Sequence, residues 1–164
     1  MSERREQSDL RAGLDRARQL GARETGLAVV TTLRPDGTAQ SSVVNAGVLN
    51  HPVTGEPVVG FVSRARVRKV AHLRERPRTT ILFRSGWDWV AVEGDAELAG
   101  PDDPLDGFDL SDLPRLLREI YATAAGGTPD DWAQLDEAMT SERHTAVLVR
   151  PVRTYPKVGP RLTW

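Results

Sequence analysis

The stretch GLAVVTTLRPDGTAQSSVVNAGVL (residues 26–49) gives the clearest indication of the fold of this chain. Residues 26–33 are a β-branched run typical of a strand, and RPDG at residues 34–37 has the residue types of a tight turn. Residues 38–49 then return as a second strand, again with β-branched residues. Because a short turn favours antiparallel pairing, the stretch predicts a β-hairpin.

Further segments of the chain also have the pattern of strands. The turn-forming residues 50–57 lead into a strand at 58–63, and residues 87–98 alternate cleanly between two faces. Six short strands with few helices favour an antiparallel barrel, closed or partly closed, because closure removes exposed strand edges. The expected strands cover residues 26–33, 38–49, 58–63, 79–85, 87–98 and 144–156.

Apolar residues at helical spacing appear in several places between these strands. Residues 8–22 carry leucines and an alanine at that spacing, a second helix ends at Pro77, and a helical pair covers about residues 112–141. The chain shows no internal repeat. We therefore expect one domain, residues 1–164, that is mainly β with flanking helices.

Composition limits the functions open to the chain. Of its 164 residues, 39% are hydrophobic and 27% are charged, and the formal net charge is only −1. These values fit an ordinary soluble domain and predict no nucleic-acid or membrane partner. The chain has no cysteine, which excludes disulfides and thiolate metal sites and fits the reducing cytoplasm. Because no apolar run suits a signal peptide or a spanning helix, we expect a cytoplasmic protein.

The inventory of catalytic residues is small. The three histidines, His51, His72 and His144, are scattered, and no HExxH or GxSxG motif is present. Neither a metal site nor a Ser-His-Asp triad is therefore expected. The glycine-rich motifs that bind phosphates in P-loop and Rossmann proteins are absent as well.

Positive charge is concentrated after the third expected strand. Between Arg64 and Arg84 there are eight lysine or arginine residues and one acid, Glu75. The first of these cations lie where the strand ending at Ser63 passes into a helix, whose N–H groups and dipole favour an anion. The junction predicts a phosphate cradle, with a solvated basic face as the alternative. The junction cations are Arg64, Arg66, Arg68 and Lys69; for Arg74, Arg76 and Arg78 the solvated face is the better interpretation.

Two further patterns have both a functional and a structural interpretation. Trp87 and Trp89 share one face of their strand, where they form the wall of an aromatic ligand's pocket, part of a two-sided core, or a subunit interface. Pocket and interface are compatible if the pocket lies at the interface. Gln40 and Ser42 share a face of the second strand and could bond a heteroaromatic ring. Polar residues on the solvent side of a strand explain them equally well.

Four sequence blocks, taken in order, resemble a known family. They are GLAVVTTLRPDGTAQSSVV, RKVAHLRERPRTTILF, GWDWVAVEGDAEL and DDWAQLDEAMTSERHTAVLVRPVRTY. Their order and spacing resemble the split β-barrel flavin and deazaflavin oxidoreductases, which are relatives of pyridoxamine 5′-phosphate oxidase. The resemblance covers about residues 10–157. The chain is most similar to the actinobacterial branch that uses the deazaflavin coenzyme F420.

The resemblance implies a fold, a cofactor and a set of site residues. The implied fold is a six-stranded antiparallel split barrel of the FMN-binding type, which forms a homodimer with two cofactor sites at the subunit interface. The implied activity is hydride transfer from reduced F420 to a conjugated small-molecule acceptor, and because the cofactor carries the hydride, no catalytic side chain is assigned. The implied cofactor-binding residues are Ser63, Arg68 and Lys69 at the phosphate, with Arg64 or Arg66 as helpers, Gln40, Ser42, Val43 and Val44 under the ring system, and Trp87 and Trp89 in the other subunit's site.

Two other interpretations stay open. The first is an FMN-binding oxidase or reductase of the same fold. It differs from an F420-dependent reductase because oxygen can serve as its electron acceptor. A non-catalytic protein that binds a cofactor, haem or a polyanion is the second, and its haem ligand would be His51, His72, His144 or Tyr155. The basic C-terminal residues either contact a ligand or form a solvated tail; they are Arg153, Lys157 and Arg161.

Overall fold

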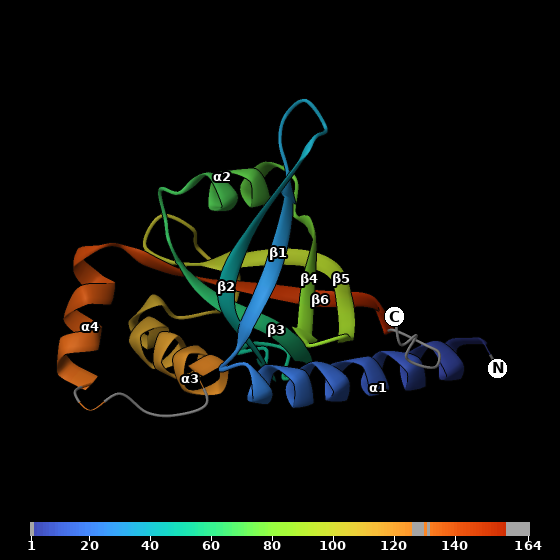
Figure 1. The fold of residues 1–164 in the computed structure, drawn as a ribbon. Coiled ribbons are helices and arrows are strands. Elements are labelled where there is room, and N and C mark those ends of the chain that lie inside the picture. The colour runs from blue at the N-terminus through green and yellow to red at the C-terminus, as the bar shows by residue number, and fades with distance from the viewer. Residues whose placement is uncertain (1, 126–129, 131, 157–164) are drawn as a thin grey trace.

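The computed structural model describes residues 2–125, 130 and 132–156 of the chain. Within these residues, six antiparallel strands close into one barrel in the order β1-β2-β3-β6-β5-β4 (Figure 1). The mainly β barrel expected from the sequence is therefore confirmed. The strands are β1 (Leu27–Leu33), β2 (Ala39–Asn50), β3 (Pro57–Arg64), β4 (Arg78–Ser85), β5 (Asp88–Ala99) and β6 (His144–Pro156).

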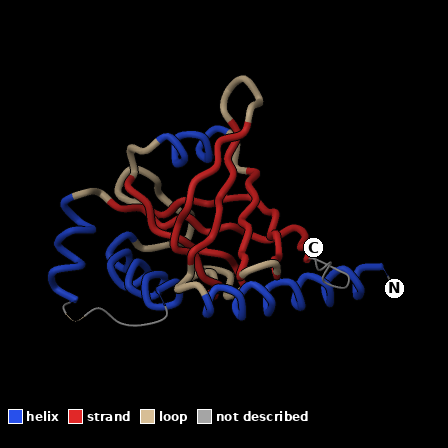
Figure 2. The backbone as a smooth tube through the Cα atoms, in the orientation of Figure 1, coloured by secondary structure: helices blue, strands red, loops and turns tan. Residues whose placement is uncertain are grey.

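The barrel closes because the last strand of the chain enters the middle of the sheet. β6 lies between β3 and β5, and β1 pairs with β4 to complete the circle. The helices surround this barrel: α1 runs along one end, α2 lies at the opposite end, and α3 and α4 stand beside it (Figures 1 and 2). They are α1 (Ser2–Arg23), α2 (Arg68–Glu75), α3 (Leu113–Ala125), which follows the short 3₁₀ helix η1 (Leu110–Asp112), and α4 (Trp132–Ser141).

The predicted elements agree with the structure to within a few residues, except at the N-terminus. α1 begins at Ser2, whereas the sequence pattern predicted a helix from about residue 8. Residues 2–9 are exposed and have no apolar face, so periodicity could not reveal them. They are rich in glutamate, glutamine and arginine, which favour the helix without tertiary contacts.

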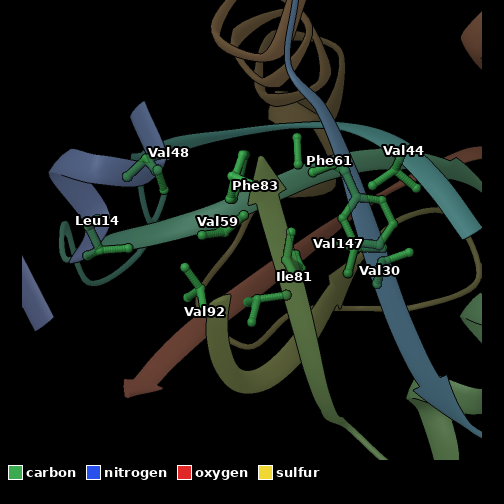
Figure 3. Close-up of a cluster of buried hydrophobic side chains, with 14 of the residues drawn as sticks. Leu14, Val30, Val44, Val48, Val59, Phe61, Ile81, Phe83, Val92 and Val147 are labelled. Atoms are coloured by element: carbon green, nitrogen blue, oxygen red, sulfur yellow. The ribbon is translucent and has the colours of Figure 1, made fainter. Parts of the chain in front are cut away.

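The barrel interior is filled by β-branched and aromatic side chains. Val30, Phe61, Ile81 and Phe83 are almost completely buried and belong to one cluster, which Leu14 of α1 joins (Figure 3). Burying a side chain of this size stabilises the fold by about 1.5–3 kcal/mol relative to leaving it exposed. The cluster therefore holds the barrel and its first helix together.

A second apolar cluster fixes the helical pair against the outside of the barrel. Ile120 of α3 and Met139 of α4 belong to this cluster together with Leu148 of β6. Gly47 of β2 lets α3 approach, because a Cβ atom there would lie only 2.7 Å from the Thr123 side chain. α3 is thereby held beside β2 and β3, and α4 lies against β6. None of the helices in the described residues is long and apolar enough to cross a membrane.

Candidate cofactor site

A cleft of about 660 Å³ opens between the barrel and the helical pair. Val43 and Val44 of β2 and Val62 of β3 form its strand wall. The helical wall is mainly apolar. The helices contribute Ile120, Tyr121, Ala124, Leu135, Ala138 and Met139, and the remaining lining residues are Thr25, Asn45, Lys69, Glu142 and His144.

Lys69 brings a cation to this cleft from the first turn of α2. Its side chain is half-buried, and burial lowers the pKa of its ammonium group. No acid in the described part of the chain pairs with it, since burial is the one cause of that shift. Val67, the N-cap residue of α2, provides no side-chain cap, and the first turn of the helix holds no acid. This end of the cleft therefore has a positive potential that suits an anion.

The other cations of the basic stretch are largely paired with acids. Arg64 donates two hydrogen bonds to Glu142, of 3.0 and 3.1 Å. The pairs further along the chain connect α2 and β4 to neighbouring residues. Acids within the fold therefore compensate the charge of these arginines. These pairs are Arg74 with Asp103, Arg76 with Glu75 and Arg78 with Asp95.

Arg66 and Arg68 are exposed and do not line the cleft. A hydrogen bond from Arg143 holds the pKa of Asp102 below its usual range, and the charge of Arg66 adds to this effect. The charge of Arg66 thus acts on the loop that carries Asp102. Of the two arginines, only Arg68 belongs to α2 itself, where its charge adds to the potential at the helix start.

Ser63 lies on the inner face of the barrel rather than in the cleft. It pairs with Thr145 across the β3–β6 ladder, and it shares a face of β3 with the buried Phe61. Among the predicted phosphate-binding residues, Lys69 is thus the one that lines the cleft.

β2 contributes two of its four predicted residues to the cleft. Val43 and Val44 line it, whereas Gln40 and Ser42 do not. Because side chains alternate along a strand, Gln40 and Ser42 share a face with the buried Val44. Val43 lies on the opposite face and is 63% exposed. The four residues that were expected under one ring system therefore lie on both faces of the strand.

Trp87 and Trp89 lie at a different surface of the molecule. They line a separate hollow of about 580 Å³ together with Arg84, and Trp87 is 70% exposed. Trp89 meets Tyr155 edge to face, with ring centroids 6.3 Å apart. The two tryptophans therefore do not line the cleft of their own chain.

Two acid–base groups that line the cleft together with Lys69 were not expected from the sequence. Glu142 was not singled out, and His144 was considered only as a haem ligand. Both line the cleft because Arg64 at the end of β3 pairs directly with His144 at the start of β6. That pairing follows from the insertion of β6 between β3 and β5, which no local sequence pattern reveals.

The remaining histidines have structural partners away from the cleft. His51 is buried, its Nε2 lies 3.0 Å from the carboxylate of Glu97, and its Nδ1 accepts from the N–H groups of Val53 and Thr54. His72 pairs through Nδ1 with a threonine hydroxyl of β1. No group of histidine and carboxylate side chains that could hold a metal ion occurs in the part of the chain that the structure describes.

The C-terminal cations are only partly covered by the structure. Arg153 is exposed and donates to the carboxylate of Glu93 on the neighbouring strand β5. Lys157 and Arg161 lie outside the described residues.

Most of the chain matches a known protein family. A family model described as pyridoxamine 5′-phosphate oxidase matches residues 15–154. The chain belongs to the pyridoxamine 5′-phosphate oxidase family. This family includes oxidoreductases, and its fold binds flavins or deazaflavins. A search of curated protein sequences finds no match to the chain.

Solved structures of distant relatives share the fold. A conserved hypothetical protein of Mycobacterium tuberculosis is 20% identical, with a TM-score of 0.60 over 84% of this chain and 83% of its own. A pyridoxamine 5′-phosphate oxidase-related, FMN-binding protein of Nostoc punctiforme is 15% identical, with a TM-score of 0.58 over 87% and 79%. A haem-binding protein of Mycobacterium smegmatis is 18% identical, with a TM-score of 0.56 over 88% and 53%. At these identities the likeness shows the fold alone.

Proposed function

We propose that this protein is an oxidoreductase that transfers hydride from reduced coenzyme F420 to a conjugated, electron-poor small molecule. Lys69 carries the proposal, because it places a half-buried cation, with no acidic partner among the described residues, in a cleft whose strand and helical walls are mainly apolar. Such a cleft suits a flat aromatic cofactor with an anionic tail. The sequence resemblance to the F420-using branch of the family supports the choice of cofactor.

The residues of the cleft fit the two ends of such a cofactor. Lys69 would give its phosphate a charge-assisted hydrogen bond, and the first N–H groups of α2 would add further donors. Val43, Val44 and Ile120 offer apolar surface to the ring system. When bound, the cofactor supplies the hydride, and the protein binds it, orients the acceptor and excludes water.

The proposal includes a homodimer in which each subunit completes the site of the other. Exposed apolar side chains support it, because Trp87 is 70% and Val43 is 63% exposed. Aromatic side chains of this kind are enriched in protein interfaces. Pairing would cover them and bring the hollow around Trp87 and Trp89 toward the partner's cleft.

FMN is the alternative cofactor, because it shares the aromatic rings and the phosphate that the cleft suits, and a solved relative is described as FMN-binding. Haem is supported less well, although another solved relative is described as haem-binding. A haem iron would bind His144 through Nε2, and Glu142 Oε2 already lies 3.6 Å from that nitrogen. A haem iron at this nitrogen would have to displace the carboxylate of Glu142.

Fluorescence titration of the purified protein tests the proposal. Oxidised F420, FMN and haemin are added in separate experiments, and quenching of tryptophan fluorescence reports binding. We expect micromolar binding of F420 and much weaker binding of FMN and haemin. Preference for FMN would make the protein a flavoprotein that can use oxygen. Binding of neither F420 nor FMN would contradict the proposal.

A further inference from the structure

We propose that Arg64, Glu142 and His144 couple anion binding at the start of α2 to protonation of the imidazole in the cleft. His144 becomes positively charged when the anion site is filled. The inference rests on the proposed function only for the identity of the anion, which would be the cofactor's phosphate. The coupling itself can be measured with an inorganic anion.

The topology of the barrel brings these three residues together. Arg64 and His144 are directly paired in the antiparallel ladder of β3 and β6, so both side chains project from the same face. Glu142 lies just before His144, after the end of α4. Its carboxylate accepts hydrogen bonds of 3.0 and 3.1 Å from Arg64, and its Oε2 lies 3.6 Å from His144 Nε2.

A backbone contact sets which nitrogen of His144 carries the hydrogen in the neutral ring. Nδ1 lies 3.3 Å from the carbonyl oxygen of Met139, and because a carbonyl can only accept, Nδ1 is the donor. Nε2 of the neutral ring then has a lone pair beside the carboxylate of Glu142, which is an unfavourable contact. The guanidinium of Arg64 offsets this contact as long as it stays bound to the carboxylate.

An anion held by Lys69 would compete with Glu142 for Arg64. Glu142 and Lys69 line the same cleft, and the long side chain of Arg64 is 62% exposed, so it is free to turn. A phosphate offers Arg64 the same forked contact that the carboxylate gives. Once Arg64 turns away, Glu142 loses two charge-assisted hydrogen bonds. A proton on Nε2 of His144 then restores an ion pair, so protonation becomes more favourable.

The remaining charged groups around His144 either keep their ion pairs when the anion binds or also favour protonation of His144 once it is bound. Asp136 and Arg143 line a hollow of about 340 Å³ beside His144, and each is already held in an ion pair, by Arg118 and Asp102. Lys69 opposes protonation of His144 until an anion neutralises it. The charged and titratable groups that line the two hollows with His144 are Lys69 from α2, Tyr121 from α3, Asp136 from α4, and Glu142 and Arg143 from the turn before β6. Arg64 of β3 is bonded to Glu142 and is the ladder partner of His144.

Such coupling would supply the proton that the proposed reaction needs. Reduction of a conjugated C=C bond breaks the π bond and adds a hydride to one carbon and a proton to the other. The hydride brings two electrons from the reduced coenzyme, which is thereby oxidised. His144 gives the proton from Nε2 and regains one from water. Because a filled anion site favours the charged form of His144, more of the enzyme carries this proton when the cofactor is in place.

Histidine side-chain NMR on the ¹⁵N-labelled full chain tests the coupling. The titration of His144 is followed with pH at constant ionic strength, in chloride and in sulfate, because sulfate does not titrate in this range. In chloride we expect the neutral ring to carry its hydrogen on Nδ1. In sulfate we expect the midpoint to rise by about 0.5–1 pH unit, the size of a lost or gained charge contact. His51 lies at the other end of β3, bonded to Glu97, and its midpoint should not move.

Two variants of exposed residues separate the coupling from a general effect of charge. Glu142→Gln removes the carboxylate, so the His144 midpoint should fall and no longer respond to sulfate. Arg64→Gln frees Glu142 for His144, so the midpoint should already be high in chloride. An Arg64→Gln midpoint equal to that of the wild type would overturn the coupling.

The sulfate experiment also distinguishes the two proposals. Sulfate binding is reported by the backbone signals of Arg68, Lys69 and Val70 at the start of α2. If these signals move while the His144 midpoint stays constant, the coupling is wrong and the anion site stands. If they do not respond to sulfate, the anion site of the proposed function is wrong, and the coupling falls with it.

Discussion

Arg74 donates to both carboxylate oxygens of Asp103, at 2.7 and 2.8 Å, and to the carbonyl oxygen of Ala65 at 2.8 Å. Lys69, at the start of the same helix, has no acidic partner within the described residues. α2 therefore carries two kinds of cation. One holds the helix to the loops around it, and the other faces the cleft with its charge uncompensated.

Replacing Lys69 should weaken cofactor binding without unfolding the protein. Lys69→Ala removes one charge-assisted hydrogen bond to the phosphate, so we expect a loss of about 1.5–3 kcal/mol, or roughly 10- to 150-fold in Kd. Fluorescence titration with F420 measures it. Arg76→Ala is the matched control, because Arg76 lies at the other end of α2 and is paired with Glu75. Equal affinities of the Lys69 variant and the wild type would remove Lys69 from the phosphate site.

The affinity for the anionic cofactor should fall at alkaline pH. Burial lowers the pKa of Lys69, so its ammonium group loses the proton at a lower pH than an exposed lysine does. The contribution of Lys69 to the affinity is complete below this pKa and is lost as the pH rises through it. Lys69→Arg should keep its affinity over the same range, because a guanidinium stays charged. Parallel pH profiles for the wild type and the arginine variant would contradict the assignment.

Removal of Arg74 should affect folding more than binding. Arg74→Ala leaves the carboxylate of Asp103, whose side chain is only 12% exposed, without its forked partner. Loss of such a partner costs about 1–3 kcal/mol in the free energy of unfolding, which urea denaturation measures. The control is Arg78→Ala, since the Arg78–Asp95 pair is about half-exposed on both sides and should matter less. A larger loss in the control than in Arg74→Ala would show that the Arg74–Asp103 pair does not hold α2 in place.

The proposed dimer predicts a second kind of binding defect. Trp87→Glu places a charge in the exposed aromatic hollow, where pairing would have to bury it. We expect a shift from dimer to monomer in light scattering, together with loss of cofactor binding. Trp132, which contacts Tyr121 within the helical pair, provides the control variant Trp132→Phe. A monomeric wild type that binds F420 fully would refute the dimeric site.

Most of the fold could be predicted from the sequence because the barrel strands follow local rules. The turn at residues 34–37, the alternation of β5 and the stop at Pro77 each marked an element boundary to within a residue or two. Closure of the barrel followed from the need to cover strand edges. The exposed first turns of α1 were missed, because they carry helix-forming residues but no apolar stripe.

The site was predictable only in part, because it depends on contacts between distant segments. Lys69 was found from its place at a strand-to-helix junction, which is a local signal. Glu142 and His144 were not assigned to the cofactor site, because their position beside Arg64 depends on the pairing of β3 with β6. The separation of Val43 from Gln40 and Ser42 follows from strand alternation, but the resemblance alone had grouped them together.

A crystal structure of the protein with oxidised F420 tests most directly whether Lys69 holds the anionic end of a cofactor. We predict the cofactor phosphate within hydrogen-bond distance of Lys69 Nζ, with the ring system against Val43 and Val44. Another hollow, of about 520 Å³ between α1 and the barrel, is lined by the cations Arg11 and Arg150. A phosphate bound there, with the cleft beside Lys69 empty, would contradict the assignment of the site.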